Sequence, residues 1–181
     1  MTSKTYDVDR RLRLFKAVVQ PTLLYGCSCW TMIGTREQLL QTTQRKMMRQ
    51  IIGFRRHTTN GELEEWVEWM IRTAQECENV MKEHGVPNFV EEVHRRKFRW
   101  AGVVARRVDN RWTKEVLTWV LDGKRSRKRP LTRWTDSLQK FCANLHGDRA
   151  ALDNSFWMTL AQDCDCWGNL EDDYVNFAWG R

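Results

Sequence analysis

Apolar side chains recur every three or four residues along most of this chain, and glycine and proline stand mainly at the joints between such runs. This spacing places apolar residues on one face of an α-helix, whereas a half-buried strand requires alternation at every second residue. We find neither alternating strand pairs nor a repeat of fixed period. The spacing therefore predicts an all-α fold, with a helical bundle followed by further short helices.

The first half of the chain is predicted to hold three helices. Asp9 can cap the first, which Pro21 would kink or end, and residues 23–26 are either helical or a tight connection. A capping-box pattern that begins at Thr35 opens the second helix, which stops at Gly53. The apolar faces of the second and third helices comprise Leu39, Thr43, Met47 and Ile51 and, after the polar turn at 58–61, Leu63, Trp66, Met70, Ala74, Cys77 and Met81.

The second half is predicted to hold shorter helices around one exposed link. Pro87 ends the third helix, and Asn88 begins a fourth. The link is residues 124–130, where five of six successive residues are cationic. The apolar positions of these helices are Val93, Phe98, Ala101 and Val104, then Trp112, Val116 and Trp119, then Trp134, Leu138, Phe141 and Leu145, then Phe156 to Ala161 and Tyr174.

Charge alternates in four blocks along the chain. Residues 1–60 hold 11 Lys/Arg against 3 Asp/Glu, and residues 61–94 hold 2 against 9. Residues 95–134 hold 14 against 3, and residues 135–181 hold 3 against 8. Two interpretations stay open. The basic blocks bind a polyanion, or the basic and acidic blocks complement each other inside one fold or against a partner subunit.

The six cysteines allow two interpretations. Cys27-x-Cys29 and Cys164-x-Cys166 could be the two halves of a metal site. However, this spacing is shorter than the usual zinc-knuckle spacing, and the four histidines are not at paired ligand spacing. Free thiols in a reducing compartment are therefore the simpler interpretation.

The sequence shows neither a membrane-spanning stretch nor a secretory signal. Its longest apolar stretches are too short to span a bilayer, and the first seven residues lack the apolar region of a secretory signal. We therefore expect a soluble intracellular protein, in the nucleus or the cytoplasm, without a membrane span.

Five segments carry a family resemblance, in the same order as in that family. Residues 14–30 contain Pro21, Leu24-Tyr-Gly26 and Trp30, and residues 39–53 contain the basic–apolar run Arg45-Lys-Met-Met-Arg-Gln-Ile-Ile-Gly53. The others are Arg96-Lys-Phe-Arg-Trp-Ala-Gly-Val103, Lys128-Arg-Pro-Leu-Thr-Arg-Trp-Thr-Asp136 and Trp157-Met-Thr-Leu-Ala-Gln-Asp163 with Trp167. Together they resemble the region downstream of the catalytic core in LINE-like (non-LTR) retrotransposon reverse transcriptases.

The resemblance implies a domain organisation and a partner. Residues 1–56 would be a thumb-like helical segment, 57–94 an acidic helix and connection, and 95–181 a post-thumb helical linker with the basic loop 124–130. In the family the thumb lies along the primer–template duplex. The chain departs from the family at Val103, where the family has histidine, and at Lys128, where it has glycine. These differences indicate a diverged or truncated copy.

Catalytic residues of that family are not found in this sequence. The polymerase requires paired aspartates on a Tyr/Phe-x-Asp-Asp hairpin to hold two metal ions. The only adjacent aspartates here are Asp172 and Asp173, followed by Tyr174 in the reverse order. No phosphate loop, Ser/His/Asp constellation or endonuclease signature is present either. We therefore expect no enzyme activity, cofactor, metal or small-molecule substrate.

The candidate nucleic-acid-binding residues are all cations in the two basic blocks. They would contact phosphates, although ordinary solvated surfaces have the same composition. They are Arg45, Lys46, Arg49, Arg55, Arg56, Arg95, Arg96, Arg99, Lys124, Arg125, Arg127, Lys128, Arg129 and Arg133. Aromatic rings could stack on bases, but helical spacing favours core packing for Trp30, Trp100, Trp112, Trp134 and Trp167.

Two functions follow from this sequence. The first is a non-catalytic nucleic-acid-binding remnant that contacts the phosphates of RNA or an RNA–DNA hybrid, as the resemblance implies. The second is a transposon-derived helical subunit of a larger protein or ribonucleoprotein assembly. The acidic blocks favour the second, because they would repel nucleic acid.

Overall fold

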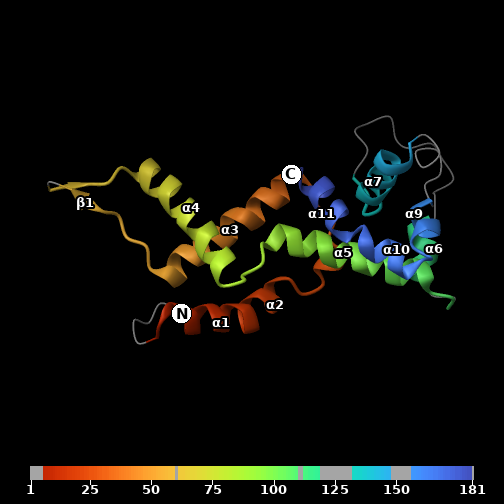
Figure 1. Cartoon of the computed structure of the whole chain (residues 1–181), viewed down its shortest axis with the longest axis horizontal. Coiled ribbons are helices and arrows are strands. Elements are labelled where there is room, and N and C mark those ends of the chain that lie inside the picture. Colours follow the sequence, from red (N-terminus) through yellow and green to blue (C-terminus); the bar gives the residue numbers. More distant parts are fainter. Residues whose placement is uncertain (1–5, 60, 110–111, 119–131, 148–155, 181) are drawn as a thin grey trace. The chain divides into compact units, whose positions relative to one another are not determined.

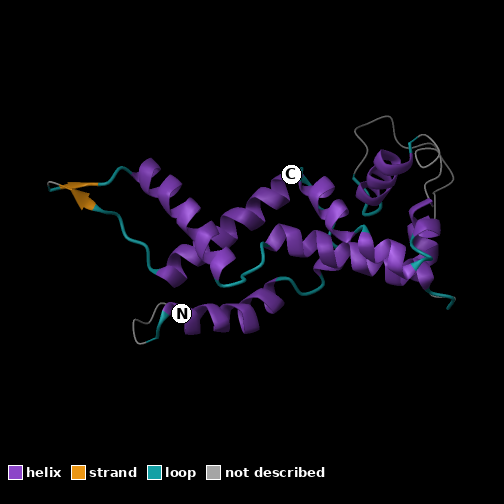
Figure 2. Ribbon diagram, in the orientation of Figure 1, coloured by secondary structure: helices purple, strands orange, loops and turns teal. Residues whose placement is uncertain are grey.

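The computed structural model describes residues 6–59, 61–109, 112–118, 132–147 and 156–180. Within these residues the ordered elements are helices, apart from one short two-stranded hairpin (Figures 1 and 2). The all-α prediction is confirmed. The chain divides into two compact units, Met1–Tyr25 with Gly34–Val90, and Gly26–Ile33 with Glu91–Arg181. No described helix is both long enough and apolar enough to cross a lipid bilayer.

The first unit opens with a helical segment of three parts: α1 (Val8–Leu14), a π-helical stretch (Phe15–Val19) and α2 (Gln20–Leu23). The predicted cap was wrong, because the Asp7 carboxylate accepts the Arg10 backbone N–H at 2.8 Å and the helix begins at residue 8. Pro21 does not end the helix either. It stands in the first turn of α2, where the wider π-helical turn before it shifts the hydrogen-bond register. Residues 24–26 form the tight connection.

The helix α3 (Gly34–Ile52) ends at Gly53, whose φ of 84° is the left-handed conformation expected at a helix C-terminus. Of its predicted apolar face, only Ile51 is fully buried. Leu39 is 67% exposed, and the buried residues are Gln44, Met48 and Ile51. Gln44 can be buried because both the NH₂ group and the oxygen of its side-chain amide have hydrogen-bond partners.

A hairpin of β1 (Thr58–Thr59) and β2 (Glu62–Leu63) precedes α4 (Trp66–Glu83). These short strands, and the start of α4 at residue 66, differ from the sequence prediction, which placed Leu63 and Trp66 on an apolar helix face. Leu63 lies in a strand, and Trp66 is 58% exposed. Cys77 and Met81 are buried as predicted, together with the polar Thr73.

The core of the first unit joins α1, α3, α4 and the start of α5 (Phe89–Arg106). Phe15 stacks on Phe89 with ring centroids 5.8 Å apart. Gln44 donates to the Pro87 carbonyl at 2.8 Å and accepts the Phe89 backbone N–H at 2.9 Å. This amide therefore satisfies two backbone groups at the start of α5 inside the core. As predicted, α5 begins after Asn88, whose side chain accepts the Val90 backbone N–H at 2.8 Å.

The second unit contains most of α5 and a set of shorter helices. These are the 3-10 turn η2 (Cys27–Cys29), α6 (Trp112–Thr118), α7 (Asp136–His146), α9 (Phe156–Leu160), α10 (Cys164–Asn169) and α11 (Glu171–Trp179). The helix α7 packs against α9 and α11.

Phe98 lies at the centre of the second core. Its ring stacks on Trp167 at 4.0 Å and on Tyr174 at 4.8 Å, and it meets Phe141 edge to face at 6.1 Å. Trp167 also donates its Nε1 proton to the Phe98 carbonyl at 3.0 Å. Stacked and edge-to-face rings stabilise such a core beyond the area they bury.

The outcome for the tryptophans is mixed. Trp167 is buried as predicted, and Trp30, Trp100 and Trp134 are partly buried. The prediction was wrong for Trp112, which is 78% exposed at the start of α6. Val116 and Leu145 are exposed as well. Residue 119 lies outside the described residues.

Candidate nucleic-acid interface

The predicted cations of α3 mostly contact α4 or the hairpin. Arg45 forms an ion pair with Glu78 at 2.7 Å. Arg49 donates from Nε to the Thr73 hydroxyl at 2.8 Å. Arg56 donates to the Glu64 carbonyl. These arginines hold elements of the first unit together, which limits how freely they can face a ligand.

Glu64 is the most strongly perturbed carboxylate of this unit. Arg72 donates to it from Nε and Nη2 at 2.9 Å each, and the His57 backbone N–H donates to it at 3.0 Å. The hydrogen bonds from Arg72, followed by that from His57, lower the pKa of Glu64 to about 2. This network ties the hairpin to α4.

The predicted cations of α5 contact carboxylates as well. Arg95 and Arg99 converge on Glu171, at 2.7 Å and 2.6 Å, and Arg95 also reaches Asp172 at 2.8 Å. Arg96 pairs with Glu92 one helical turn earlier at 2.6 Å. Burial alone would raise the pKa of Glu171, but the hydrogen bonds from Arg99 and Arg95 outweigh it and leave this pKa below its ordinary value.

These pairs join basic and acidic blocks of the sequence. Arg45 and Glu78 connect the first basic block to the first acidic block, and Arg99 and Glu171 connect the second basic block to the second acidic one. This agrees with the interpretation that the blocks complement each other inside the fold. Exposed ion pairs stabilise by only about 0–1 kcal/mol each, so their main effect is to weaken the positive field around α5.

Three predicted cations behave differently. Lys46, Arg55 and Arg133 are exposed, and their side chains have no ion-pair or hydrogen-bond partner among the described residues. The basic link, with Lys124, Arg125, Arg127, Lys128 and Arg129, lies outside the described residues. Among the predicted cations that the structure describes, these three are therefore the ones available to an anionic partner.

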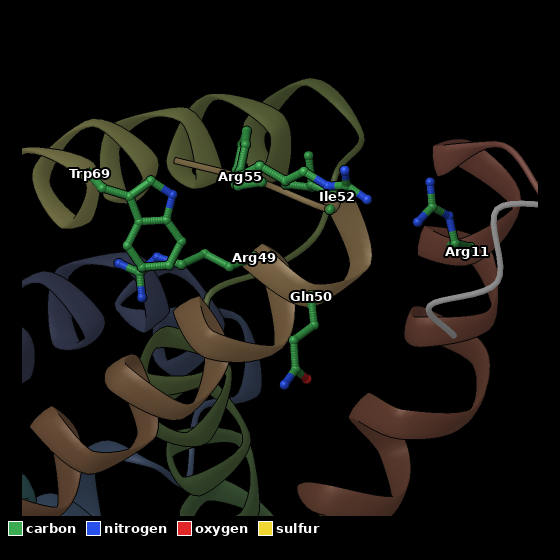
Figure 3. Close-up of a pocket in the computed structure, with 8 residues that line it drawn as sticks. Arg11, Arg49, Gln50, Ile52, Arg55 and Trp69 are labelled. Atoms are coloured by element: carbon green, nitrogen blue, oxygen red, sulfur yellow. The ribbon is translucent and has the colours of Figure 1, made fainter. Parts of the chain in front are cut away.

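Arg55 also lines a hollow of about 480 Å³ in the first unit. The hollow lies between α1, the end of α3 and the start of α4, and its wall is partly cationic and partly apolar (Figure 3). Figure 3 shows the Arg11 and Arg55 guanidinium groups directed toward the gap beside the last turn of α3. The lining residues are Arg11, Arg49, Gln50, Ile52, Gly53, Phe54, Arg55 and Trp69.

Arg49 and Trp69 form a rigid side of this hollow. The Arg49 guanidinium lies 5.5 Å from the centre of the indole ring and also donates from Nη2 to the Met70 carbonyl at 3.3 Å. The indole Nε1 of Trp69 is buried and has no hydrogen-bond acceptor in the described structure. Leaving such a donor unpaired costs about 1–3 kcal/mol, so a buried indole N–H without an acceptor is uncommon.

Sequence reasoning did not single out Arg11, Gln50 or Trp69 for this hollow. Arg11 belongs to an α1 stretch with three arginines, and Trp69 looked like one of many aromatic residues on an acidic helix. The only available signal was the cationic composition of residues 10–13. The approach of α1 to the end of α3 is a tertiary feature without a local sequence signature.

The cysteines are all free thiols in this structure. Cys29, Cys164 and Cys166 are exposed. The Cys166 thiol donates a hydrogen bond to the Asp163 carboxylate, and this raises the pKa of the thiol. In the described part of the chain, no group of three or more His, Cys, Asp or Glu side chains is placed to hold a metal ion. Burial raises the pKa of Cys77 and that of Cys142 to about 11.

Comparison with known proteins finds a transposon-derived relative. A Caenorhabditis elegans protein described as uncharacterized and transposon-derived is 32% identical over 168 residues, which cover 92% of this chain and 55% of the relative. This chain is related to a transposon-derived protein. It spans about half the length of that relative. No family model and no solved structure matches the chain.

The relationship supports the expected transposon origin at a coarse level. The matched region takes in 92% of the chain and therefore includes α3 and α5. The name of that relative mentions no reverse transcriptase and no bound partner.

Proposed function

We propose that this chain is a non-catalytic, nucleic-acid-binding part of a non-LTR retrotransposon reverse transcriptase, which contacts the phosphates of RNA or an RNA–DNA hybrid. The order of the five resembling segments supports the reverse-transcriptase origin, and the transposon-derived relative supports the broader class. Its role would be to hold a strand without reading base sequence.

One observation carries the binding proposal. Lys46 lies in the stretch that resembles the second thumb helix, and Arg55 lies just beyond its end at Gly53. Both side chains are exposed and have no partner among the described residues, although Arg45 and Arg49 are engaged. Exposed cations with free donors are what phosphate contacts require. Arg133 supplies a similar group in the second unit.

Salt-dependent binding tests this proposal. The full chain is titrated with an RNA–DNA hybrid at several salt concentrations, as wild type and as the double variant Lys46→Gln with Arg133→Gln. Each lost phosphate contact should reduce the slope of log affinity against log salt by about 0.9. The matched control is Lys82→Gln with Lys140→Gln, which removes the same charge at exposed positions outside the predicted set. Equal slopes for both double variants would contradict the proposal.

We also propose that the chain carries no polymerase activity, because the paired catalytic aspartates are not in its sequence. The chain is incubated with primer–template, Mg²⁺ and nucleotides. Primer extension should stay at background. Template-dependent extension that follows the protein through a second purification would refute this.

A second function, a subunit of a larger assembly, is favoured by an apolar surface at the start of α4. Trp66 and Ile71 are 58% and 68% exposed, and Val67 and Leu63 beside them are also exposed. Neighbouring apolar side chains in water commonly mark a protein contact. Purification from its native cells, with and without ribonuclease, separates the functions. A stoichiometric protein partner that survives ribonuclease and is lost in Trp66→Glu would favour the assembly.

A further inference from the structure

The wall of the hollow in the first unit is partly cationic and partly apolar, and a site for phosphate alone would not need the apolar part. Arg11 and Arg55 bring guanidinium groups to it, whereas Ile52, Phe54 and Trp69 contribute apolar surface. At about 480 Å³ it falls in the size range of sites for small ligands and is too confined for a duplex. Its ligand should therefore carry one anionic group and one flat or apolar group.

We propose that this hollow binds the terminal nucleotide of a nucleic-acid strand, with its phosphate monoester on Arg11 and Arg55 and its base against the apolar wall. This inference rests on the proposed nucleic-acid function and adds a site for a strand end. A terminal phosphate carries a charge of about −1.5 to −2 at neutral pH, whereas a phosphate inside a strand carries −1. Converging guanidinium groups therefore favour the terminus over the internal backbone.

The local backbone explains how the cations reach one place. The left-handed turn at Gly53 lets Gly53 and Phe54 both donate to the Arg49 carbonyl, at 2.9 Å and 3.2 Å. This turn ends α3 and leads Arg55 along the hollow, opposite Arg11 of α1 (Figure 3). Gly53 is required here because a side chain is strained at this φ.

The wall of the hollow holds charges of both signs, and its arginine side chains differ in how firmly they are held. The C-terminal end of α3 contributes a partial negative charge of about half an elementary charge, which opposes an anion. Three guanidinium groups outweigh it. Arg49 is fixed by Thr73 and by the Trp69 ring, whereas the Arg55 side chain has no described partner. Arg55 is therefore the main ligand-binding cation, and Arg49 supplies a fixed charge.

Trp69 gives this site a local reporter. Its side chain lines the hollow, and its buried Nε1 proton has no acceptor in the described structure. The NMR signal of this indole N–H should therefore respond to a ligand bound nearby. The signal is assigned by its loss in Trp69→Phe. Uridine 5′-monophosphate should shift it at concentrations where uridine does not, because the phosphate supplies the charge-dependent contact.

The test uses the full chain with 5′-phosphorylated and 5′-hydroxyl tetrathymidylate. Two charge-assisted hydrogen bonds predict that wild type prefers the phosphorylated strand by at least about tenfold. Arg55→Gln and Arg11→Gln should each reduce this preference to about twofold, whereas the control Lys82→Gln should keep it. Circular dichroism of each variant checks that the helices remain, and either arginine variant suffices if the other fails to fold.

The outcomes separate this inference from the proposed function. Equal binding of both tetrathymidylates by wild type overturns the strand-end site, even if hybrid binding with a steep salt dependence shows that the proposed function holds. A uridine monophosphate shift without binding of any strand refutes both the strand-end site and the proposed function. Displacement of the nucleotide by a glutamate-rich peptide at equal concentration overturns the inference in favour of a protein ligand.

Discussion

Gly102 should be intolerant of even one added methyl group. It lies inside α5, where a Cβ would meet Trp167 Cδ1 and Nε1 at 2.7 Å each, a distance that real Cβ atoms essentially never show. The indole cannot easily retreat, because it is buried, stacks on Phe98 at 4.0 Å and donates to the Phe98 carbonyl at 3.0 Å. The ring would have to give up one of these contacts.

Two opposing effects determine how much Gly102→Ala changes the free energy of unfolding. Alanine favours the helix over glycine by about 1 kcal/mol. Overpacking a well-filled core costs about 1–3 kcal/mol, and a weakened Trp167–Phe98 hydrogen bond adds about 1 kcal/mol. We therefore expect a net destabilisation of about 1–3 kcal/mol, despite the better helix propensity of alanine.

Thermal and urea unfolding followed by circular dichroism measure this difference. About 2–4 °C in Tm is expected for each kcal/mol in a chain of this size. The matched control is Gly168→Ala in α10, where an added Cβ has nothing within 4 Å and should be neutral or stabilising. In a Trp167→Leu background, the Gly102→Ala change should lose its cost. If both alanine variants melt alike in the wild-type background, the ring is mobile and our account of this packing is wrong.

Three further predictions follow from burial and charge. The lowered pKa of Glu64 contributes stability above about pH 4.5 that is lost as the pH falls toward about 2. The free energy of unfolding of Glu64→Gln should therefore depend less on pH than that of wild type between these values. Trp157→Ala should destabilise by about 3–5 kcal/mol, whereas Trp112→Ala should change unfolding by less than about 0.5 kcal/mol; equal effects would contradict the burial of these rings. Alkylation at pH 8 followed by mass spectrometry should modify the exposed thiols before the buried ones, in the order Cys29 and Cys164, then Cys166, then Cys27, Cys77 and Cys142.

The sequence predicted the helices better than their buried faces. On α5 the predicted residues Phe98, Ala101 and Val104 are buried, because this helix is strongly amphipathic and apolar spacing alone locates its face. On α3 the prediction failed at Leu39 and Gln44. Gln44 is a core residue because the Pro87 carbonyl and the Phe89 backbone N–H pair with its side-chain amide. The hydropathy of the sequence does not reveal these partners.

The candidate site shows a similar division. Cationic composition made Arg45 and Arg99 candidates for phosphate contacts, but their partners Glu78 and Glu171 lie 33 and 72 residues away in the sequence. Which cations remain available depends on those long-range pairs. The hollow at the end of α3 depends in the same way on α1, so Arg11 could not be connected with it from local pattern alone.

The salt dependence of nucleic-acid binding by the whole chain tests the central claim most directly. Affinity for an RNA–DNA hybrid is measured at several salt concentrations, with two unrelated sequences, for wild type and for the link variant Arg125→Gln, Arg127→Gln and Arg129→Gln. Our account predicts equal affinity for both sequences, a linear fall of log affinity with log salt, and a slope reduced by about one unit for each lost contact. No measurable binding at low salt, or identical slopes for wild type and variant, would contradict it.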